Sequence, residues 1–208
     1  MVDDTRTGRK RAAIRTAART LFLRQGYQGT SMDEIAALAA VSKQTGYKQF
    51  TDKELLFTEI VLGTLDQAGG PFLADVDALA GTDDLAADLH ALARRYLAAV
   101  LRPEVLRLRR MVIGEAHRLR ELARAYYDRA PERTLAGLAD SFGRLAGRGL
   151  LRAADPELAA THFAFLVLGR PLDRALFLGD DDIPDAAELA RLADAAADVF
   201  LAAYGAPT

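Results

Sequence analysis

Apolar residues recur every three or four positions along almost the whole chain, which is the spacing of amphipathic helices. No segment alternates apolar and polar residues with a period of two over the length of a strand. The pattern therefore predicts an all-α protein of about nine helices. The last two expected helices, residues 156–178 and 185–204, carry wide faces of apolar or small residues, which suits burial against other helices.

Glycine and proline residues mark the expected interruptions. The Gly69-Gly70-Pro71 run is the strongest breaker, so the fourth helix is expected to extend from residue 53 to about residue 68. Pro131 lies inside a helix expected over residues 119–148. Because proline has no N–H to donate, we expect that helix to be kinked or split there.

Residues 30–56 hold the caps and apolar positions of two short helices, joined by a tight turn and followed by the start of a third. Thr30 or Ser31 is expected to cap the first short helix and Ser42 the second, because small polar side chains accept hydrogen bonds from the free amides at helix starts. Residues 39–41 form the turn. This layout is typical of a helix-turn-helix, which places its second helix in the major groove of DNA.

Charge is unevenly distributed along the chain, whose net charge is only −2. Residues 6–50 hold nine basic and two acidic side chains, a local charge of +7 that leaves −9 for the remainder. A basic head on an acidic body orients a protein on a polyanion. An ordinary solvated helix face would explain the same charges, so the asymmetry supports DNA binding only together with the helix-turn-helix.

Composition excludes several classes of protein. The chain has no cysteine, which excludes disulfides, thiolate catalysis and cysteine-ligated metal, and makes a cytoplasmic location the default expectation. No run reaches the ~18 apolar residues of a membrane span, and the N-terminus lacks the apolar core of a signal peptide. No glycine-rich phosphate loop, nucleophile elbow or zinc-protease helix appears, so we expect no enzyme and no cofactor.

Residues 9–57 resemble the DNA-binding domain of the TetR family of bacterial transcriptional regulators. The resemblance rests on a basic first helix and on an ordered series of short motifs: Leu21-Phe22, Gly26-Tyr27, Thr30-Ser31-Met32-Asp33-Glu34-Ile35-Ala36, Val41-Ser42-Lys43-Gln44-Thr45, Tyr47-Lys48-Gln49-Phe50 and Asp52-Lys53-Glu54-Leu55-Leu56-Phe57. Residues 119–151 are similar to the AefR-like group of C-terminal domains.

The resemblance implies an N-terminal helix-turn-helix domain (residues 1–52) and a larger helical ligand-binding and dimerisation domain (residues 53–208). It implies a homodimer joined through the helices near 156–178 and 185–204, each subunit presenting a recognition helix to half of a palindromic operator in double-stranded DNA. Most members of the family are repressors that a small-molecule effector releases from DNA. We expect the same here, with no membrane partner.

The motif assigns candidate DNA contacts of two kinds. The start of the recognition helix is expected to read base edges, since lysine can donate to guanine and glutamine can pair with adenine; its candidates are Lys43, Gln44 and Thr45. Other residues are expected to contact phosphates, namely Thr30, Ser31, Tyr47, Lys48 and Lys53. The basic residues Arg6, Arg9, Lys10 and Arg11 form either an arm on the DNA or a disordered tail. Phe22, Ile35 and Phe50 are expected in the core.

Candidate effector-binding residues are aromatic, methionine and histidine side chains, which suit an apolar pocket with few polar anchors. They are Tyr96, Met111, His117, Tyr127, Phe142, Phe163 and Phe165, and each of them also fits plain core packing. His90, His117 and His162 show no metal-ligand spacing, so we expect no metal site.

Gly46 and Ala40 depart from the family pattern. Gly46 stands where the family usually has a branched apolar residue, and a glycine inside a helix costs roughly 0.5–1 kcal/mol relative to alanine. We therefore expect a recognition helix that is looser than usual without DNA. Ala40 replaces the usual turn glycine, so the turn must accept a side chain. The alternative function is a helical ligand-binding or scaffold protein whose DNA-binding head has lost its activity.

Overall fold

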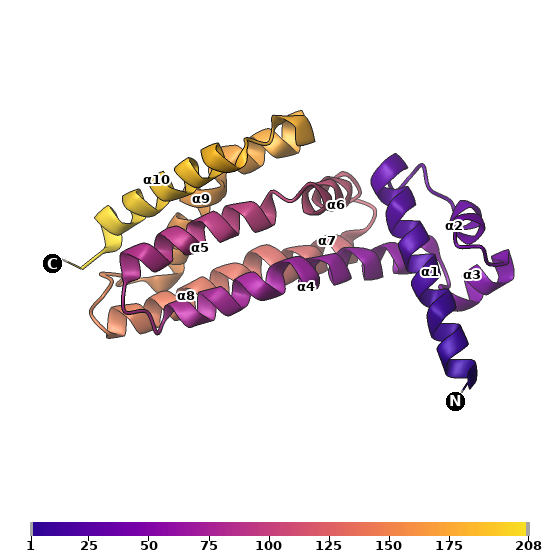
Figure 1. The fold of residues 1–208 in the computed structure, drawn as a ribbon, viewed down its shortest axis with the longest axis horizontal. Coiled ribbons are helices and arrows are strands. Elements are labelled where there is room, and N and C mark those ends of the chain that lie inside the picture. The colour runs from indigo at the N-terminus through magenta and orange to yellow at the C-terminus, as the bar shows by residue number, and fades with distance from the viewer. Residues whose placement is uncertain (1, 207–208) are drawn as a thin grey trace. The chain divides into compact units, whose positions relative to one another are not determined.

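The computed structural model describes the backbone of residues 2–206 and the side chains of residues 7–206. Over this range the chain forms ten α-helices, one π segment and one 3-10 segment (Figure 1). It folds as two compact units, Met1–Thr64 with Arg107–Tyr126 and Leu65–Leu106 with Tyr127–Thr208. The all-α prediction is confirmed. The predicted division into residues 1–52 and 53–208 stays a prediction, because the first unit ends inside a helix and includes a later segment.

The first unit contains the helix-turn-helix. Its helices are α1 (Val2–Gln25), α2 (Met32–Leu38), α3 (Lys43–Gln49), the first part of α4 (Lys53–Leu79), the end of α6 (Pro103–Gly114) and α7 (Arg120–Tyr127). Helix α1 begins at Val2, five residues before the predicted start. The expected core residues Phe22, Ile35 and Phe50 are buried, which confirms that prediction. The Phe57 ring packs 5.0 Å from Phe22 and joins α4 to this core.

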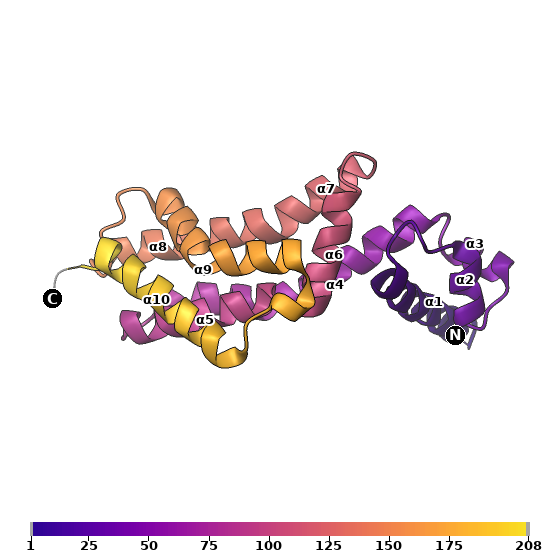
Figure 2. The ribbon, with the colours of Figure 1, turned by 90° about the horizontal axis from the view of Figure 1, so that it is seen from above.

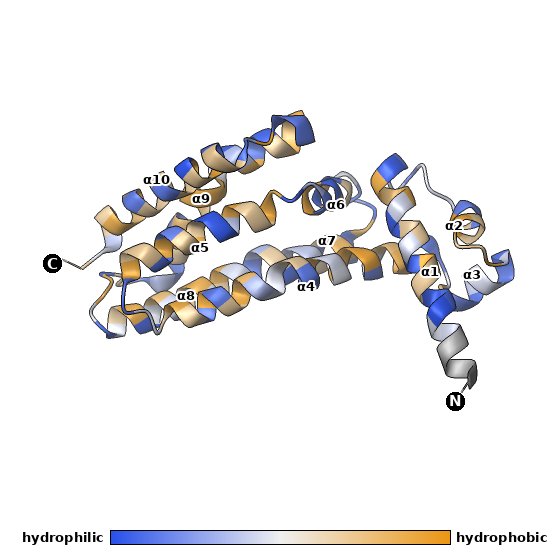
Figure 3. Ribbon diagram, in the orientation of Figure 1, coloured by the Kyte–Doolittle hydropathy of each residue, from blue (hydrophilic) through white to orange (hydrophobic). Residues whose placement is uncertain are grey.

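The second unit packs long helices around an aromatic core. It holds α5 (Leu85–Val100), the π segment η1 (Asp128–Glu132), α8 (Arg133–Gly147), α9 (Pro156–Leu178), the 3-10 segment η2 (Asp180–Asp182) and α10 (Ala186–Tyr204). Phe142, Phe163 and Phe200 are fully buried, with ring centroids 5.0–5.7 Å apart. Figure 3 shows polar and apolar residues mixed along α5 and α8, as expected of amphipathic helices.

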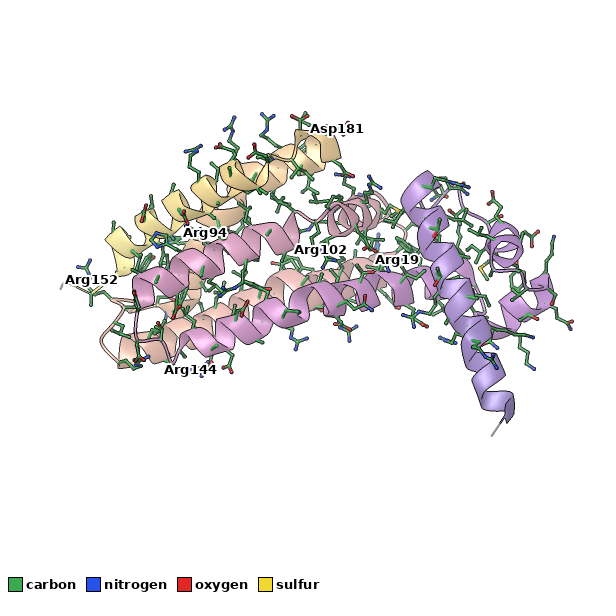
Figure 4. All side chains as sticks on the ribbon, viewed as in Figure 1. Arg19, Arg94, Arg102, Arg144, Arg152 and Asp181 are labelled. Carbon is green, nitrogen blue, oxygen red and sulfur yellow. The ribbon has the colours of Figure 1, made fainter. Side chains whose placement is uncertain are left out.

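Ion pairs link the outer faces of this unit. The Arg94 guanidinium on α5 contacts the Asp194 carboxylate on α10 through two bonds of 2.6 Å (Figure 4). Arg144 on α8 contacts Asp77 near the end of α4 at 2.6 Å. These groups are partly to largely exposed to solvent, so each pair contributes little to stability.

The break predicted at Gly69-Gly70-Pro71 is wrong, since α4 continues through it to Leu79. Pro71 is exposed, so water can hydrate the carbonyl that loses its partner. The following turns bury Phe72, Val76 and Leu79, and the Phe72 ring stacks on Tyr96 at 4.6 Å. Burying such side chains contributes about 1.5–3 kcal/mol each, which outweighs the ~3 kcal/mol helix penalty of one proline.

The interruption predicted at Pro131 is present. The π segment η1 contains Pro131 and separates α7 from α8, which confirms the split predicted there. Helix α9, seen from above in Figure 2, is kinked at Gly169 (φ −11°, ψ −105°), two residues before Pro171. A pattern of apolar residues does not reveal this kink. No helix in the described part of the chain is long and apolar enough to cross a membrane.

Candidate nucleic-acid interface

The start of α2 is closed by a capping box. The Ser31 hydroxyl accepts a hydrogen bond from the Glu34 amide at 3.2 Å, and the Glu34 carboxylate accepts one from the Ser31 amide at 2.8 Å. Hydrogen bonds from the Ser31 hydroxyl and amide hold the pKa of Glu34 below its usual value. Of the two caps that the sequence allowed, Ser31 is therefore the one used.

The turn between α2 and α3 places an alanine in the left-handed region. Ala40 has φ +53°, a backbone conformation that favours glycine because a Cβ approaches the following carbonyl. The Val41 amide donates to the Ala36 carbonyl at 3.0 Å, which fixes this conformation. The turn therefore accepts the side chain at position 40, at a cost in backbone strain.

Helix α3 is capped by Ser42, as predicted. The Ser42 hydroxyl accepts a bond from the Thr45 amide at 3.2 Å and contacts the Thr45 hydroxyl at 2.9 Å. Gly46 is buried and faces α2, where an added Cβ would lie 3.5 Å from the Ala36 Cβ. That is ordinary van der Waals contact, so helices α2 and α3 leave room for one methyl group at Gly46.

The exposed side of α3 presents a short row of polar side chains. Lys43, Gln44, Tyr47 and Lys48 are all exposed, and within the described part of the chain Gln44 and Lys48 form no hydrogen bond through their side chains. Thr45 is only half-exposed, and its hydroxyl already contacts the cap. Gln44, Tyr47 and Lys48 are thus the candidates most available to a DNA partner.

Thr30 lies on the loop that joins α1 to α2, and Lys53, the first residue of α4, reaches this loop through its side chain. Thr30 is buried and its hydroxyl donates to the Gly26 carbonyl at 2.8 Å. The Lys53 ammonium donates to the carbonyls of Tyr27 and Thr30 at 2.9 and 2.8 Å and lies 4.4 Å from the centre of the Tyr27 ring. Burial, and secondarily the charge of Arg118, lower the pKa of Lys53. Both side chains therefore shape the loop, and their phosphate contacts stay a prediction.

One residue of the basic segment expected as an arm or a tail, Arg11, is held against the folded domain. The Arg11 guanidinium lies 4.3 Å from the centre of the Phe50 ring, donates to the Gln49 carbonyl at 3.1 Å and pairs with Glu59. Arg11 thus connects α1 to the end of α3 and to α4. The side chain of Arg6 lies outside the described residues.

Two residues that sequence reasoning missed support the α1–α2 loop. The Glu115 carboxylate, just after α6, accepts bonds of 2.8 Å from the Gln28 amide, and it also pairs with Arg118 at 3.1 Å. The Arg118 guanidinium lies 5.0 Å from the centre of the Tyr27 ring. Gln28 and Glu115 are 87 positions apart in sequence, so no local pattern could have paired them.

The candidate effector-binding residues do not form one cluster. Phe142 and Phe163 pack together in the core of the second unit, and Tyr96 stacks on Phe72. Tyr127 and Phe165 are exposed, with 54% and 70% of their surface accessible. The other two candidates, Met111 and His117, belong to the first unit. Their effector role stays a prediction.

Two of the three histidines contact an ordinary polar partner. His90 contacts Asp198 at 2.8 Å, and His162 contacts the Tyr204 hydroxyl at 2.5 Å. Among the residues that the structure describes, no group of three histidine or carboxylate side chains is placed to hold a metal ion.

Comparison with known proteins agrees with this geometry. Residues 14–60 match the model of bacterial regulatory proteins of the TetR family, and residues 87–206 match the C-terminal domain of AefR-like transcriptional repressors. No curated protein matches the chain.

Solved structures of regulators resemble the whole chain. A TetR-family transcriptional regulator from Mesorhizobium loti is 44% identical, with a TM-score of 0.89 over 96% of this chain and 98% of that one. The flavonoid-responsive regulator FrrA is 32% identical, with a TM-score of 0.74 over 97% and 100%. SmeT, the repressor of the Stenotrophomonas maltophilia multidrug efflux pump SmeDEF, is 26% identical, with a TM-score of 0.65 over 94% and 90%.

The resemblances read from residues 9–57 and from the later helices are therefore confirmed, and neither the family nor these structural neighbours are enzymes. The chain belongs to the TetR family of DNA-binding transcriptional regulators and carries an AefR-like C-terminal domain.

Proposed function

We propose that this chain is a cytoplasmic repressor that binds a palindromic operator as a homodimer and leaves it when a small molecule binds. The observation that carries the proposal is the capped α3 helix, whose exposed side chains Gln44, Tyr47 and Lys48 form no hydrogen bond within the part of the chain that the structure describes. In this arrangement Gln44 reads a base edge, whereas Tyr47 and Lys48 contact phosphates.

Dimerisation through α9 and α10 is supported by the apolar side chains that these helices leave exposed. They are Leu158, Phe165, Leu166, Phe177, Leu178 and Val199, of which Phe177 is 86% and Phe165 70% accessible. Five of these side chains are on α9 and Val199 is on α10, and such exposed apolar side chains favour burial against a partner. A second copy of the same two helices is the simplest partner, because twofold contacts are the commonest in soluble oligomers.

The effector is proposed to be an aromatic compound. FrrA responds to flavonoids, and SmeT has been solved as a complex with triclosan. Flavonoids and triclosan both carry aromatic rings, which suits the aromatic character of the candidate residues, among them Tyr96, Phe142 and Phe163.

An electrophoretic shift with the DNA beside the chain's own gene tests the proposal. At low salt we expect a discrete complex and a protected palindrome, and addition of a flavonoid panel should identify a compound that releases the DNA. Affinity should fall steeply with salt because phosphate contacts release counterions. No protected palindrome beside the gene or elsewhere in the genome would refute the repressor assignment.

Light scattering tests the dimer separately. We expect twice the chain mass, and a Phe165→Glu/Val199→Glu variant should dissociate because two charges would have to be buried in the contact. A dimer that survives this change would place the interface elsewhere.

A further inference from the structure

Asp33 and Lys43 form an ion pair that bridges the two helices of the helix-turn-helix. Asp33 is in the first turn of α2 and Lys43 is the first residue of α3. The Lys43 ammonium lies 2.5 Å from a carboxylate oxygen of Asp33, and the two side chains are 70% and 50% exposed. The pair therefore stands on the open surface at the start of the recognition helix.

The Asp33 carboxylate caps neither helix; in the first turn of α2 it otherwise only favours the positive end of the helix dipole. The cap of α2 uses Glu34 and Ser31, and the cap of α3 uses Ser42. An exposed ion pair of this kind contributes little to stability. In residues 6–50, Asp33 and Glu34 are the only acidic side chains among nine basic ones. A negative charge at this place weakens attraction to phosphates, so it opposes binding to DNA in general.

The two charged groups are complementary to the edge of one base pair. In the major groove a G·C pair presents the guanine O6 and N7 acceptors beside the cytosine N4 amino donor. The O6 and N4 atoms face each other across a hydrogen bond, about 2.9 Å apart. A lysine ammonium and a carboxylate oxygen held side by side at 2.5 Å offer a donor and an acceptor with similar spacing.

We infer that Asp33 and Lys43 act as one unit that reads a G·C base pair in each half-site, with Lys43 donating to guanine and Asp33 accepting from cytosine. The inference rests on the proposed operator binding. On unmatched DNA the carboxylate keeps Lys43 from the nearest phosphate and repels that phosphate itself. Asp33 is thus a specificity-determining residue that lowers affinity for the wrong sequences.

Selection from a random duplex library tests this reading. The wild-type chain and the Asp33→Asn, Asp33→Ala and Lys43→Ala variants are each used to enrich 30-base-pair duplexes, which are then sequenced. We expect the wild type to enrich G·C at one position of each half-site. Asp33→Ala and Lys43→Ala should each lose at least about fivefold of that preference, and Asp33→Asn should shift it towards A·T, because an amide pairs with adenine.

Affinity for an unselected duplex supplies an independent readout. Asp33→Asn should bind it several-fold more tightly than the wild type, and the slope of log affinity against log salt should steepen by ~0.9 for each lysine that newly contacts a phosphate. The gain should disappear in the Asp33→Asn/Lys43→Ala double variant. Glu132→Gln is the control, because it removes the same charge from an exposed residue of the other compact unit.

The outcomes separate the two hypotheses. A wild-type chain that enriches no duplex at low salt contradicts the proposed function itself. The other outcome is that the wild type enriches a clear operator and that Asp33→Asn, Asp33→Ala and Lys43→Ala keep the same base preference. That result overturns only the inference that Asp33 and Lys43 read a base pair. Circular dichroism of each variant confirms that it is folded, and Lys43→Ala still decides the question if changes at Asp33 unfold α2.

Discussion

The structure around Gly46 allows the effect of a substitution on the free energy of unfolding to be calculated. It lies inside α3, is buried, and faces Ala36 at a distance that leaves space for one methyl group. The Gly46→Ala substitution removes the entropic penalty of a glycine in a helix, about 1 kcal/mol. It also buries a methyl group in contact with Ala36, which contributes about 0.8 kcal/mol. We therefore expect an increase of about 1.5–2 kcal/mol in the free energy of unfolding.

Urea denaturation of the full chain, followed by circular dichroism, measures this change. Gly8→Ala is the matched control, because Gly8 is an exposed glycine of α1 in the same compact unit and its added Cβ would meet no atom within 4 Å. In the control, the free energy of unfolding should rise only by the helix penalty of glycine, about 1 kcal/mol. The difference between the two variants then isolates the contact with Ala36.

A side chain larger than alanine at position 46 should lower the stability. Gly46→Val adds two methyl groups beyond a Cβ that already touches Ala36 at 3.5 Å, so α2 and α3 would have to separate. We expect Gly46→Val to be less stable than Gly46→Ala. If Gly46→Ala gains no more stability than Gly8→Ala, the contact with α2 is not as close as the structure places it, and the reasoning fails.

Further predictions concern the same domain. Ala40→Gly should raise stability by about 0.5–1 kcal/mol in urea denaturation, because it relieves the left-handed conformation at φ +53°; a loss would mean that the turn is not strained. Gly29→Ala should lower the melting temperature, since its Cβ would lie 2.5 Å from the Gln25 carbonyl oxygen, and an unchanged value would contradict that close approach. Tyr47→Ala should weaken binding to all DNA about equally in gel shifts, whereas Gln44→Ala should weaken operator binding more than binding to random DNA; equal losses would refute these roles. The pKa of Glu34 is lowered in the folded state, so its contribution to stability is present above its usual value of 4.5 and is lost as the pH falls through the lower folded value. The acid limb of a stability-against-pH curve should therefore flatten in Glu34→Gln, and a curve identical to that of the wild type would show that the capping box is not formed.

Local signals in the sequence were sufficient for the elements of the helix-turn-helix. Ser31 and Ser42 cap the two short helices because a small polar side chain satisfies amides within three residues of itself. Pro131 interrupts its helix because the missing N–H acts at that point in the chain. Such effects depend on neighbours a few positions away, and a single sequence contains all of them.

Tertiary packing decided the features that depend on distant residues. Helix α4 passes through Gly69-Gly70-Pro71 because Phe72 and Val76 are buried against helices that lie far along the chain. The sequence marked Lys43 as a candidate base contact, but only the folded contact between α2 and α3 brings its ammonium to 2.5 Å from the Asp33 carboxylate. The motif determined that this chain has a DNA-reading helix. Burial and hydrogen bonds between distant residues determined which polar side chains of the motif are left exposed, and which, such as Thr30 and Lys53, instead hold the α1–α2 loop.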